Sequence, residues 1–226
     1  KRIRAQIEAS GRDEPGPNPF RAVISTETIT LQQQLDEKDL PFLKGVYGNF
    51  TYHKLQGRSN YLCMNKAKEN AIGDVETDRL LQKIHKFRGN ISSGEFKDVS
   101  KAINEYLSPQ VWSKLTGSSD YCANNACEPD ECYGALSRAK AKNADIVVVN
   151  HKILAIHFEM VSMSSFGMES DGMFGRVNTI IVDEAHKLEE VLAGHWEERY
   201  NEWEVADHTN RIIAGMDMAF AYNKSN

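Results

Sequence analysis

The sequence lacks any long run of apolar residues. No segment approaches the roughly 20 uninterrupted apolar residues of a membrane-spanning helix, and the first residues, Lys-Arg-Ile-Arg, are not followed by the apolar core of a signal peptide. Hydrophobic residues nevertheless make up 41% of the 226 residues, which is enough to build one large or two small domains. We therefore expect a globular cytoplasmic protein without a membrane partner.

The chain also lacks an overall basic character, since its formal net charge is -5. The charge is unevenly placed: residues 51–90 hold eight Lys or Arg against four acids, a net of +4, and residues 143–226 hold six against fourteen, a net of -8. A polyanion should prefer the first block. A charge run of this kind is as often a solvated surface that binds nothing as it is a binding surface.

Cysteine is scarce, and the four that occur are Cys63, Cys122, Cys127 and Cys132. In an intracellular protein, such clustering favours metal or cluster ligation over disulfides. The last three have the spacing Cys-x4-Cys-x4-Cys, without the Cys-x-x-Cys pairs of many structural zinc sites. Iron-sulfur ligation tolerates wider and uneven gaps. The spacing therefore favours a cluster, with zinc or unliganded core cysteines as the alternatives.

Three short apolar runs, residues 20–25, 145–149 and 179–182, predict strands. Continuous apolar runs of this kind suit strands that are buried on both faces of a parallel sheet. The first run leads through a threonine-bearing turn into helical spacing at residues 31–35. This succession of strand, turn and helix predicts half of a βαβ unit.

The segment from residue 52 to about residue 142 has a different pattern, and all four cysteines lie within it. Short helical stretches, such as residues 78–87 and 96–107, alternate with polar turns, so we interpret the segment as a helical insertion. Residues 162–175 are rich in Met, Ser and Gly, and we expect a mobile loop there. After His186 the chain becomes helical and acidic.

The tetrapeptide Asp183-Glu184-Ala185-His186 directly follows the last predicted strand and precedes a helix. This is the context of a Walker B motif, in which an acid at the strand end holds Mg²⁺ through water and a second acid orients the attacking water. Asp183 and Glu184 are the candidates for these roles, and His186 completes the catalytic set. A chance match to a given tetrapeptide has a probability of roughly one in a thousand in a chain of this length.

The phosphate-binding motif Gly-x-x-x-x-Gly-Lys-Ser/Thr is absent from these residues. The loop that would cradle the phosphates of ATP must lie upstream of Lys1 or be missing. We therefore treat the chain as a possible fragment of a larger protein, and we expect it to be inactive as an ATPase by itself.

Five segments, read together, resemble the XPD/DinG family of iron-sulfur superfamily 2 DNA helicases, and the bacterial DinG branch is the most similar. The resemblance extends over most of residues 20–195, and the order of the segments is more specific than any one of them. The segments are residues 23–35, residues 54–63, the cysteine triplet, residues 146–154 and the DEAH box.

The resemblance implies an α/β fold in which a partial RecA-like parallel-sheet motor domain is interrupted by a helical iron-sulfur insertion. The motor would occupy residues 1–51 and 143–195, the iron-sulfur domain residues 52–142, and the start of a helical arch residues 196–226. By the same resemblance, Cys63, Cys122, Cys127 and Cys132 would hold a 4Fe-4S cluster, with Mg²⁺ at Asp183 and ATP as substrate.

The implied activity is that of an ATP-dependent 5′ to 3′ helicase on single-stranded and forked DNA, with the cluster domain aiding strand separation. In a bacterium this would place the protein at the nucleoid. Two alternatives remain: a cluster- or zinc-bearing DNA-binding or sensing module without a complete motor, and a DEAH ATPase with structural zinc.

Five residues are candidates for DNA contacts. Thr26 and Thr28 lie where a strand turns into a helix, so their hydroxyl groups could meet a phosphate or could simply cap the helix. Lys54, Arg58 and Tyr61 lie just before Cys63 and offer the cations and stacking faces that single-stranded DNA requires. Ordinary surface placement is at least as common for each of them.

Three histidines have no assigned chemistry. His151, which follows Asn150, matches the family pattern, and its role is open. His85 and His157 have no ligand-like partner at a suitable spacing, so we expect both to be structural.

Overall fold

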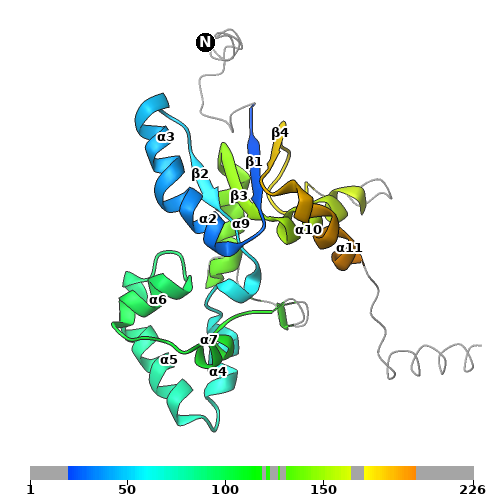
Figure 1. The fold of residues 1–226 in the computed structure, drawn as a ribbon. Helices are drawn as coiled ribbons and strands as arrows, with labels where there is room; N and C mark the ends of the chain where they lie inside the picture. Colours follow the sequence, from blue (N-terminus) through cyan, green and yellow to red (C-terminus); the bar gives the residue numbers. More distant parts are fainter. Residues whose placement is uncertain (1–19, 119–120, 123–126, 128–130, 164–170, 197–226) are drawn as a thin grey trace, which may run out of the picture.

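A parallel β-sheet forms the centre of the computed structural model, which describes residues 20–118, 121–122, 127, 131–163 and 171–196 (Figure 1). Its four strands have the order β2-β3-β1-β4, and every pairing is parallel. The α/β class and the parallel sheet are therefore confirmed. The strands are β1 (Ala22–Thr26), β2 (Tyr52–Lys54), β3 (Ile146–Asn150) and β4 (Thr179–Val182).

The three strands predicted from the sequence differ in burial. Val147, Val148 and Val149 of β3 are fully buried between β1 and β2, as a run of valines predicts. In contrast, Ile180 and Ile181 of β4 are 42% and 49% exposed. The prediction of burial on both faces is wrong for β4, because within the described residues β4 pairs with β1 alone and lies at the sheet edge.

Strand β2 is a part of the sheet that the sequence pattern did not predict. It pairs with β3 from Tyr52 opposite Ile146, and the N–H of Leu55 donates to the carbonyl of Val148 at 2.9 Å. A three-residue strand is too short to show a period of two. Residues 52–54, which were predicted to begin the insertion, therefore belong to the sheet.

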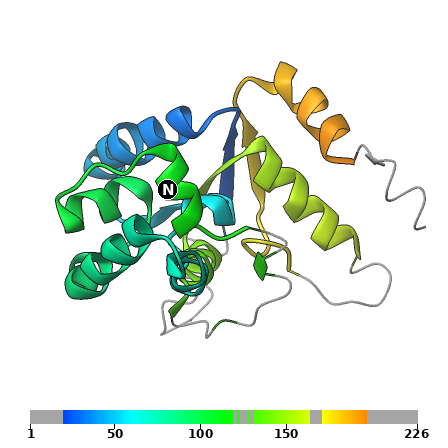
Figure 2. The ribbon, with the colours of Figure 1, turned by 90° about the horizontal axis from the view of Figure 1, so that it is seen from below.

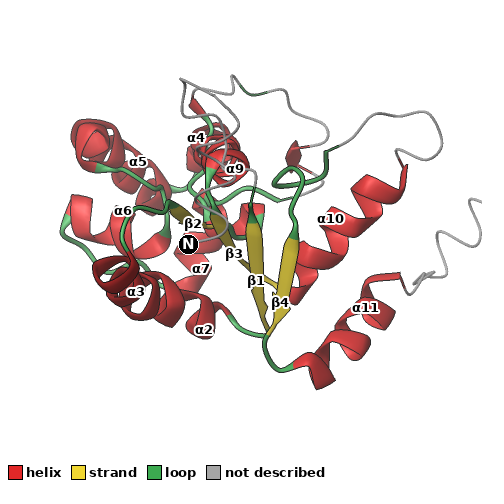
Figure 3. Cartoon of the chain, turned by 90° about the horizontal axis from the view of Figure 1, so that it is seen from above, coloured by secondary structure: helices red, strands yellow, loops and turns green. Residues whose placement is uncertain are grey.

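Helices lie on both sides of the strands. After β1, α2 (Ile29–Gln34), a π-helical segment (Leu35–Asp39) and α3 (Leu40–Tyr47) follow without a break. Figures 2 and 3 show these helices to one side of the strands and α10 (His151–Met163) and α11 (Leu188–Trp196) to the other. None of the helices in the described ranges is long and apolar enough to cross a bilayer.

A second unit, built of helices, lies below the sheet in Figure 1. Leu80, Ile84, Val99 and Leu115 belong to its core, which is separate from the core of the sheet. The helical character predicted for this segment is therefore confirmed. The helices are α4 (Met64–Ala71), α5 (Val75–Phe87), α6 (Phe96–Ile103) and α7 (Pro109–Leu115), with 3-10 turns at Arg58–Asn60 and Arg88–Asn90.

Local capping explains why two of these helices differ in length from the prediction. Helix α5 begins at Val75, three residues earlier, because the Asp74 carboxylate accepts hydrogen bonds from the N–H groups of Glu76 and Thr77. Helix α6 ends early, at Ile103, because Asn104 takes the left-handed conformation that closes a helix (φ 51°).

Helix α9 (Tyr133–Asn143) joins the helical unit to the sheet. Tyr133 at its start packs in the helical core, whereas Ala141 near its end packs in the sheet core. Arg21, buried just before β1, donates to the carbonyl oxygens of Ala141, Ala144 and Phe174 at 2.7, 2.9 and 2.9 Å. This guanidinium ties α9 to the sheet, and its burial lowers the pKa of Arg21.

The predicted loop at residues 162–175 is anchored at its described end. Phe174 is fully buried and stacks on His157, with ring centroids 3.8 Å apart, and the N–H of Met173 donates to His157 Nδ1 at 3.2 Å. Residues 172–175 are buried, so this end of the predicted loop packs in the core, and residues 162 and 163 belong to α10 rather than to a loop. His157 is structural, as predicted, and burial lowers its pKa to about 4; residues 164–170 lie outside the described ranges.

Two glycines with a positive φ provide a matched test of packing at the junction of α9 with the helical unit. A Cβ at Gly94 (φ 71°) would lie 2.3 to 2.7 Å from atoms of Tyr133, whereas a Cβ at Gly73 (φ 81°) would meet nothing within 4 Å. We expect Gly73→Ala to cost about 1–2 kcal/mol of unfolding free energy from backbone strain, and Gly94→Ala roughly 1–3 kcal/mol more from overpacking. Denaturant unfolding of both variants measures the difference, and equal losses would contradict this account.

Candidate functional site

The DEAH box lies at the C-terminal edge of the sheet, directly after β4. The N–H of Asp183 donates to the carbonyl of Ser25 at 2.9 Å, which fixes the turn against β1. Asp183 Oδ1 in turn accepts the N–H of Glu184 at 3.0 Å. The side chains of Asp183, Glu184 and His186 are all exposed. Both carboxylates therefore stand at a strand tip, where a Walker B motif places them.

The backbone at Glu184 is strained. Its φ of 51° and ψ of 46° lie in the left-handed region, which costs a non-glycine residue roughly 1–2 kcal/mol. This turn redirects the chain from β4 into a 3-10 segment (Ala185–Lys187), which contains His186, and then into α11. Strain at a residue that carries a candidate catalytic side chain is typical of functional sites.

The two threonines at the end of β1 make hydrogen bonds within their own turn. Thr26 is buried, and its hydroxyl donates to the carbonyl of Thr28 at 3.2 Å. Thr28 is exposed, and its Oγ1 accepts the N–H of Leu31 at 3.2 Å as the N-cap of α2. Thr28 therefore caps α2 and is still exposed to solvent, whereas Thr26 has no exposed surface for a nucleic acid.

Lys54 and Tyr61 are buried, unlike the exposed DNA contacts predicted from the sequence. Lys54, 6% exposed, forms ion pairs with Glu95 at 2.7 Å and Asp36 at 3.8 Å. The hydroxyl of Tyr61, 3% exposed, hydrogen bonds to Ser137 Oγ at 2.8 Å, and burial raises the pKa of Tyr61 to about 12. These side chains hold the sheet, the helical unit and α9 together.

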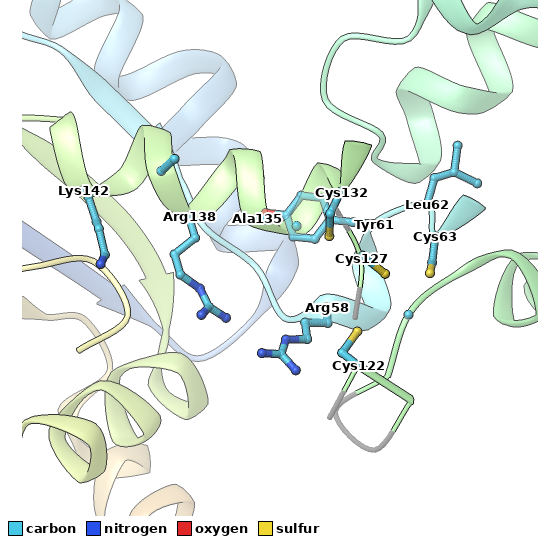
Figure 4. A pocket seen from close by; sticks show the side chains of 13 residues that line it. Arg58, Tyr61, Leu62, Cys63, Cys122, Cys127, Cys132, Ala135, Arg138 and Lys142 are labelled. Carbon is cyan, nitrogen blue, oxygen red and sulfur yellow. The ribbon is translucent and has the colours of Figure 1, made fainter. Parts of the chain in front are cut away.

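The four cysteines line one cavity of about 400 Å³, and Figure 4 shows their sulfur atoms gathered on its wall. Two glycines leave space beside the thiols: a Cβ at Gly117 would lie 3.4 Å from Cys122 Sγ, and one at Gly134 would lie 4.0 Å from Cys132 Sγ. Cys63 and the three later cysteines are far apart in sequence and line the same cavity.

The four thiols can be compared with the needs of the two candidate groups, a zinc ion and a four-iron cluster. Within the described parts of the chain, no three His, Cys, Asp or Glu side chains form a group that could hold a metal ion. Tetrahedral zinc needs four thiolates at about 2.3 Å from one centre, whereas the cysteines of a four-iron cluster bind a much larger group. Four thiols that line one cavity match a four-iron cluster in the type and number of donors.

Helix ends position two of the cysteines. Cys63 is the N-cap residue of α4 and Cys132 is that of α9, so each of these two cysteines lies at the start of a helix. Burial raises the pKa of Cys63, and the nearby amide groups of Asn65 and Lys66 oppose this shift. The side-chain amide of Asn65 also donates to Cys127 Sγ at 3.3 Å.

Three cations line the same cavity: Arg58, Arg138 and Lys142 (Figure 4). Burial, and then the charge of Arg58, lowers the pKa of Arg138. The sequence predicted only Arg58. Arg138 and Lys142 were missed, although their i, i+4 spacing in a helical stretch after Cys132 indicates a shared helix face.

Comparison with known proteins identifies relatives, although no family model matches the chain. The chain is 33% identical over 184 residues to "ATP-dependent DNA helicase YoaA" of Haemophilus influenzae, covering 78% of the chain and 27% of that protein. It is 29% identical over 180 residues to the Escherichia coli YoaA, with the same coverage. It is 30% identical over 190 residues to "ATP-dependent helicase DinG" of Mycobacterium tuberculosis, covering 74% and 27%.

The chain spans about a quarter of the length of the curated relatives that it matches. The alignments nevertheless cover about three quarters of the chain itself. The resemblance inferred from the order of the motifs is thereby confirmed: this chain belongs to the DinG/XPD-like helicase family, together with the YoaA and DinG proteins.

Proposed function

We propose that the chain is part of an ATP-dependent DNA helicase that moves 5′ to 3′ on single-stranded DNA and opens forked duplexes. The observation that carries the proposal is the presence, in one chain, of DEAH carboxylates at the edge of a parallel sheet and four thiols around one cavity. The names of the curated relatives support it.

In the proposed nucleotide site, Asp183 holds Mg²⁺ through water and Glu184 orients the water that attacks the γ-phosphate of ATP. Bound Mg²⁺ would neutralise negative charge on the phosphates of ATP. His186 follows in the same exposed turn and completes the catalytic set. In this proposal the phosphate-binding loop belongs to a part of the protein outside these 226 residues, and the exposed Ile180 and Ile181 on the edge strand support a further motor element beside β4.

In the proposed cluster site, Cys63, Cys122, Cys127 and Cys132 hold a 4Fe-4S cluster. A bound cluster supplies a rigid cross-link and a one-electron redox centre. The protein contributes the starts of α4 and α9, where Cys63 and Cys132 are the N-cap residues. The four ligands would join α4, the triplet segment and α9, and so stiffen the helical unit that meets the DNA fork.

For DNA, the proposal relies on Arg58, supported by Arg138 and Lys142 on the same cavity wall, and on the exposed Thr28. Cations in a groove contribute most of the affinity for a phosphate backbone. Lys54, Tyr61 and Thr26 are left out of the proposed DNA surface because they are buried. The proposed arch, residues 196–226, lies almost entirely outside the described ranges.

A second candidate function is a cluster-bearing DNA-binding or sensing module without a working motor. The absence of a phosphate-binding motif from these residues favours it. The helicase and the binding or sensing module differ in one testable respect: only the helicase couples ATP hydrolysis to strand separation.

Strand separation by the full-length protein, purified without oxygen, tests the proposed function. With ATP and Mg²⁺, we expect unwinding of forked duplexes and of duplexes with a 5′ single-stranded tail, and little unwinding of those with a 3′ tail. A fluorescence assay of the released strand measures both rates. Hydrolysis of ATP without release of the strand would refute the helicase, and DNA binding without hydrolysis would support the second candidate.

A further inference from the structure

A buried serine-histidine pair joins the end of β1 to the DEAH turn. The hydroxyl of Ser25 lies 2.7 Å from Nδ1 of His151, and the two residues are 0% and 1% exposed. The carbonyl of Ser25 also accepts the N–H of Asp183 at 2.9 Å. Ser25 therefore contacts both His151 at the start of α10 and the first residue of the DEAH box.

The ring of His151 also lies near the DEAH turn, because the backbone of Asp183 and Glu184 raises the pKa of His151 against the lowering caused by burial. The second ring nitrogen, Nε2, is buried and has no hydrogen-bond partner in the described residues. An unpaired buried nitrogen is unfavourable, so a small movement that gave it a partner would be stabilising.

The tautomer of His151 follows from the groups around it. Burial favours the neutral ring, which has one N–H donor and one acceptor nitrogen. The N–H groups of Asp183 and Glu184 already donate to Ser25 and to Asp183 Oδ1. Carbonyl oxygens are the remaining backbone partners, so Nε2 carries the proton and the Ser25 hydroxyl donates to Nδ1.

We propose that His151 is a positioning residue that couples the DNA-binding end of β1 to the catalytic turn. A DNA strand held at Thr28 shifts the end of β1, Ser25 moves the His151 ring, and Nε2–H then reaches a carbonyl oxygen of Asp183 or Glu184. This bond holds the strained Glu184 backbone in its hydrolytic position. The proposal rests on the helicase function, because it needs a DNA-stimulated ATPase.

Four variants of the full-length protein test the coupling through the ratio of ATPase rates with and without saturating single-stranded DNA. His151→Asn keeps a polar group near the Nδ1 position and loses the one near Nε2, whereas His151→Gln does the reverse; Ser25→Ala removes the partner hydroxyl. The matched control is His157→Gln, since His157 is the other buried histidine of α10 and stacks on Phe174.

We expect the ratio to fall about tenfold in all three coupling variants, through kcat with DNA and not through KM for ATP, and to stay unchanged in the control. Combining Ser25→Ala with His151→Asn should add no further loss, because both act on one path. A control that loses as much as the coupling variants, or additive losses in the double variant, would overturn the coupling. A wild-type ATPase that DNA does not stimulate would overturn the helicase proposal and the coupling with it.

Discussion

Replacing Glu184 by Gln in the full-length protein is expected to lower DNA-stimulated ATP hydrolysis by about 10²- to 10⁴-fold, the usual contribution of a general base. The amide cannot accept a proton from the attacking water, but it has the shape of the carboxylate and leaves the turn intact. Because Asp183 remains as the proposed Mg²⁺ ligand, affinity for ATP should change little. Steady-state hydrolysis and nucleotide-binding titrations measure the two effects.

Glu189→Gln is the matched control for this prediction. Glu189 is also exposed and lies only one turn further on, in the first turn of α11. Removing its charge changes the local electrostatics in the same sense without touching the proposed site. We expect hydrolysis within about twofold of wild type. A similar collapse in both variants would mean that the acidic character of the segment, and not the Glu184 carboxylate, supports hydrolysis.

Replacing any one of Cys63, Cys122, Cys127 and Cys132 by Ser should remove most of the iron and sulfide from protein purified without oxygen. All four thiols line one cavity, so losing one opens the site and weakens the others. Wild-type protein should contain about four iron and four sulfide atoms per chain, with broad absorbance near 400 nm. Elemental analysis and absorbance spectra give the result.

Lys68→Ser is the control for the cysteine variants, because Lys68 is exposed on α4, the helix that Cys63 begins. It should retain the wild-type iron content. Colourless wild-type protein with one zinc per chain would instead identify a DEAH ATPase with structural zinc. Variants that retain full iron would exclude the substituted cysteine as a ligand.

The sheet could be predicted from the sequence where a strand leaves a local pattern. Residues 20–25 and 145–149 were displaced by one or two residues from β1 and β3, and residues 179–182 coincide with β4. The edge position of β4 could not be predicted. An apolar composition indicates that a strand tends to be buried, but it does not indicate which strands lie beside it.

The candidate site divides in the same way. The DEAH box and the cysteine triplet could be identified because their residues are consecutive or regularly spaced, and Cys63 because cysteine is scarce in the chain. The burial of Lys54 and Tyr61 could not be predicted. Their partners, Glu95 and Ser137, are far away in sequence and meet them only in the folded chain. The bond between Ser25 and His151 belongs to this second group, since nothing near either residue indicates the other.

The pairing of β1 also constrains the order in which the chain folds. Its neighbours β3 and β4 begin only at Ile146 and Thr179, whereas the helical unit completes its core between Tyr61 and Tyr133. Low contact order favours early folding, and synthesis proceeds from the N-terminus. We therefore expect the helical unit to fold during synthesis, before β1 pairs with β3 and β4, so that the proposed cluster site would form before the sheet is complete.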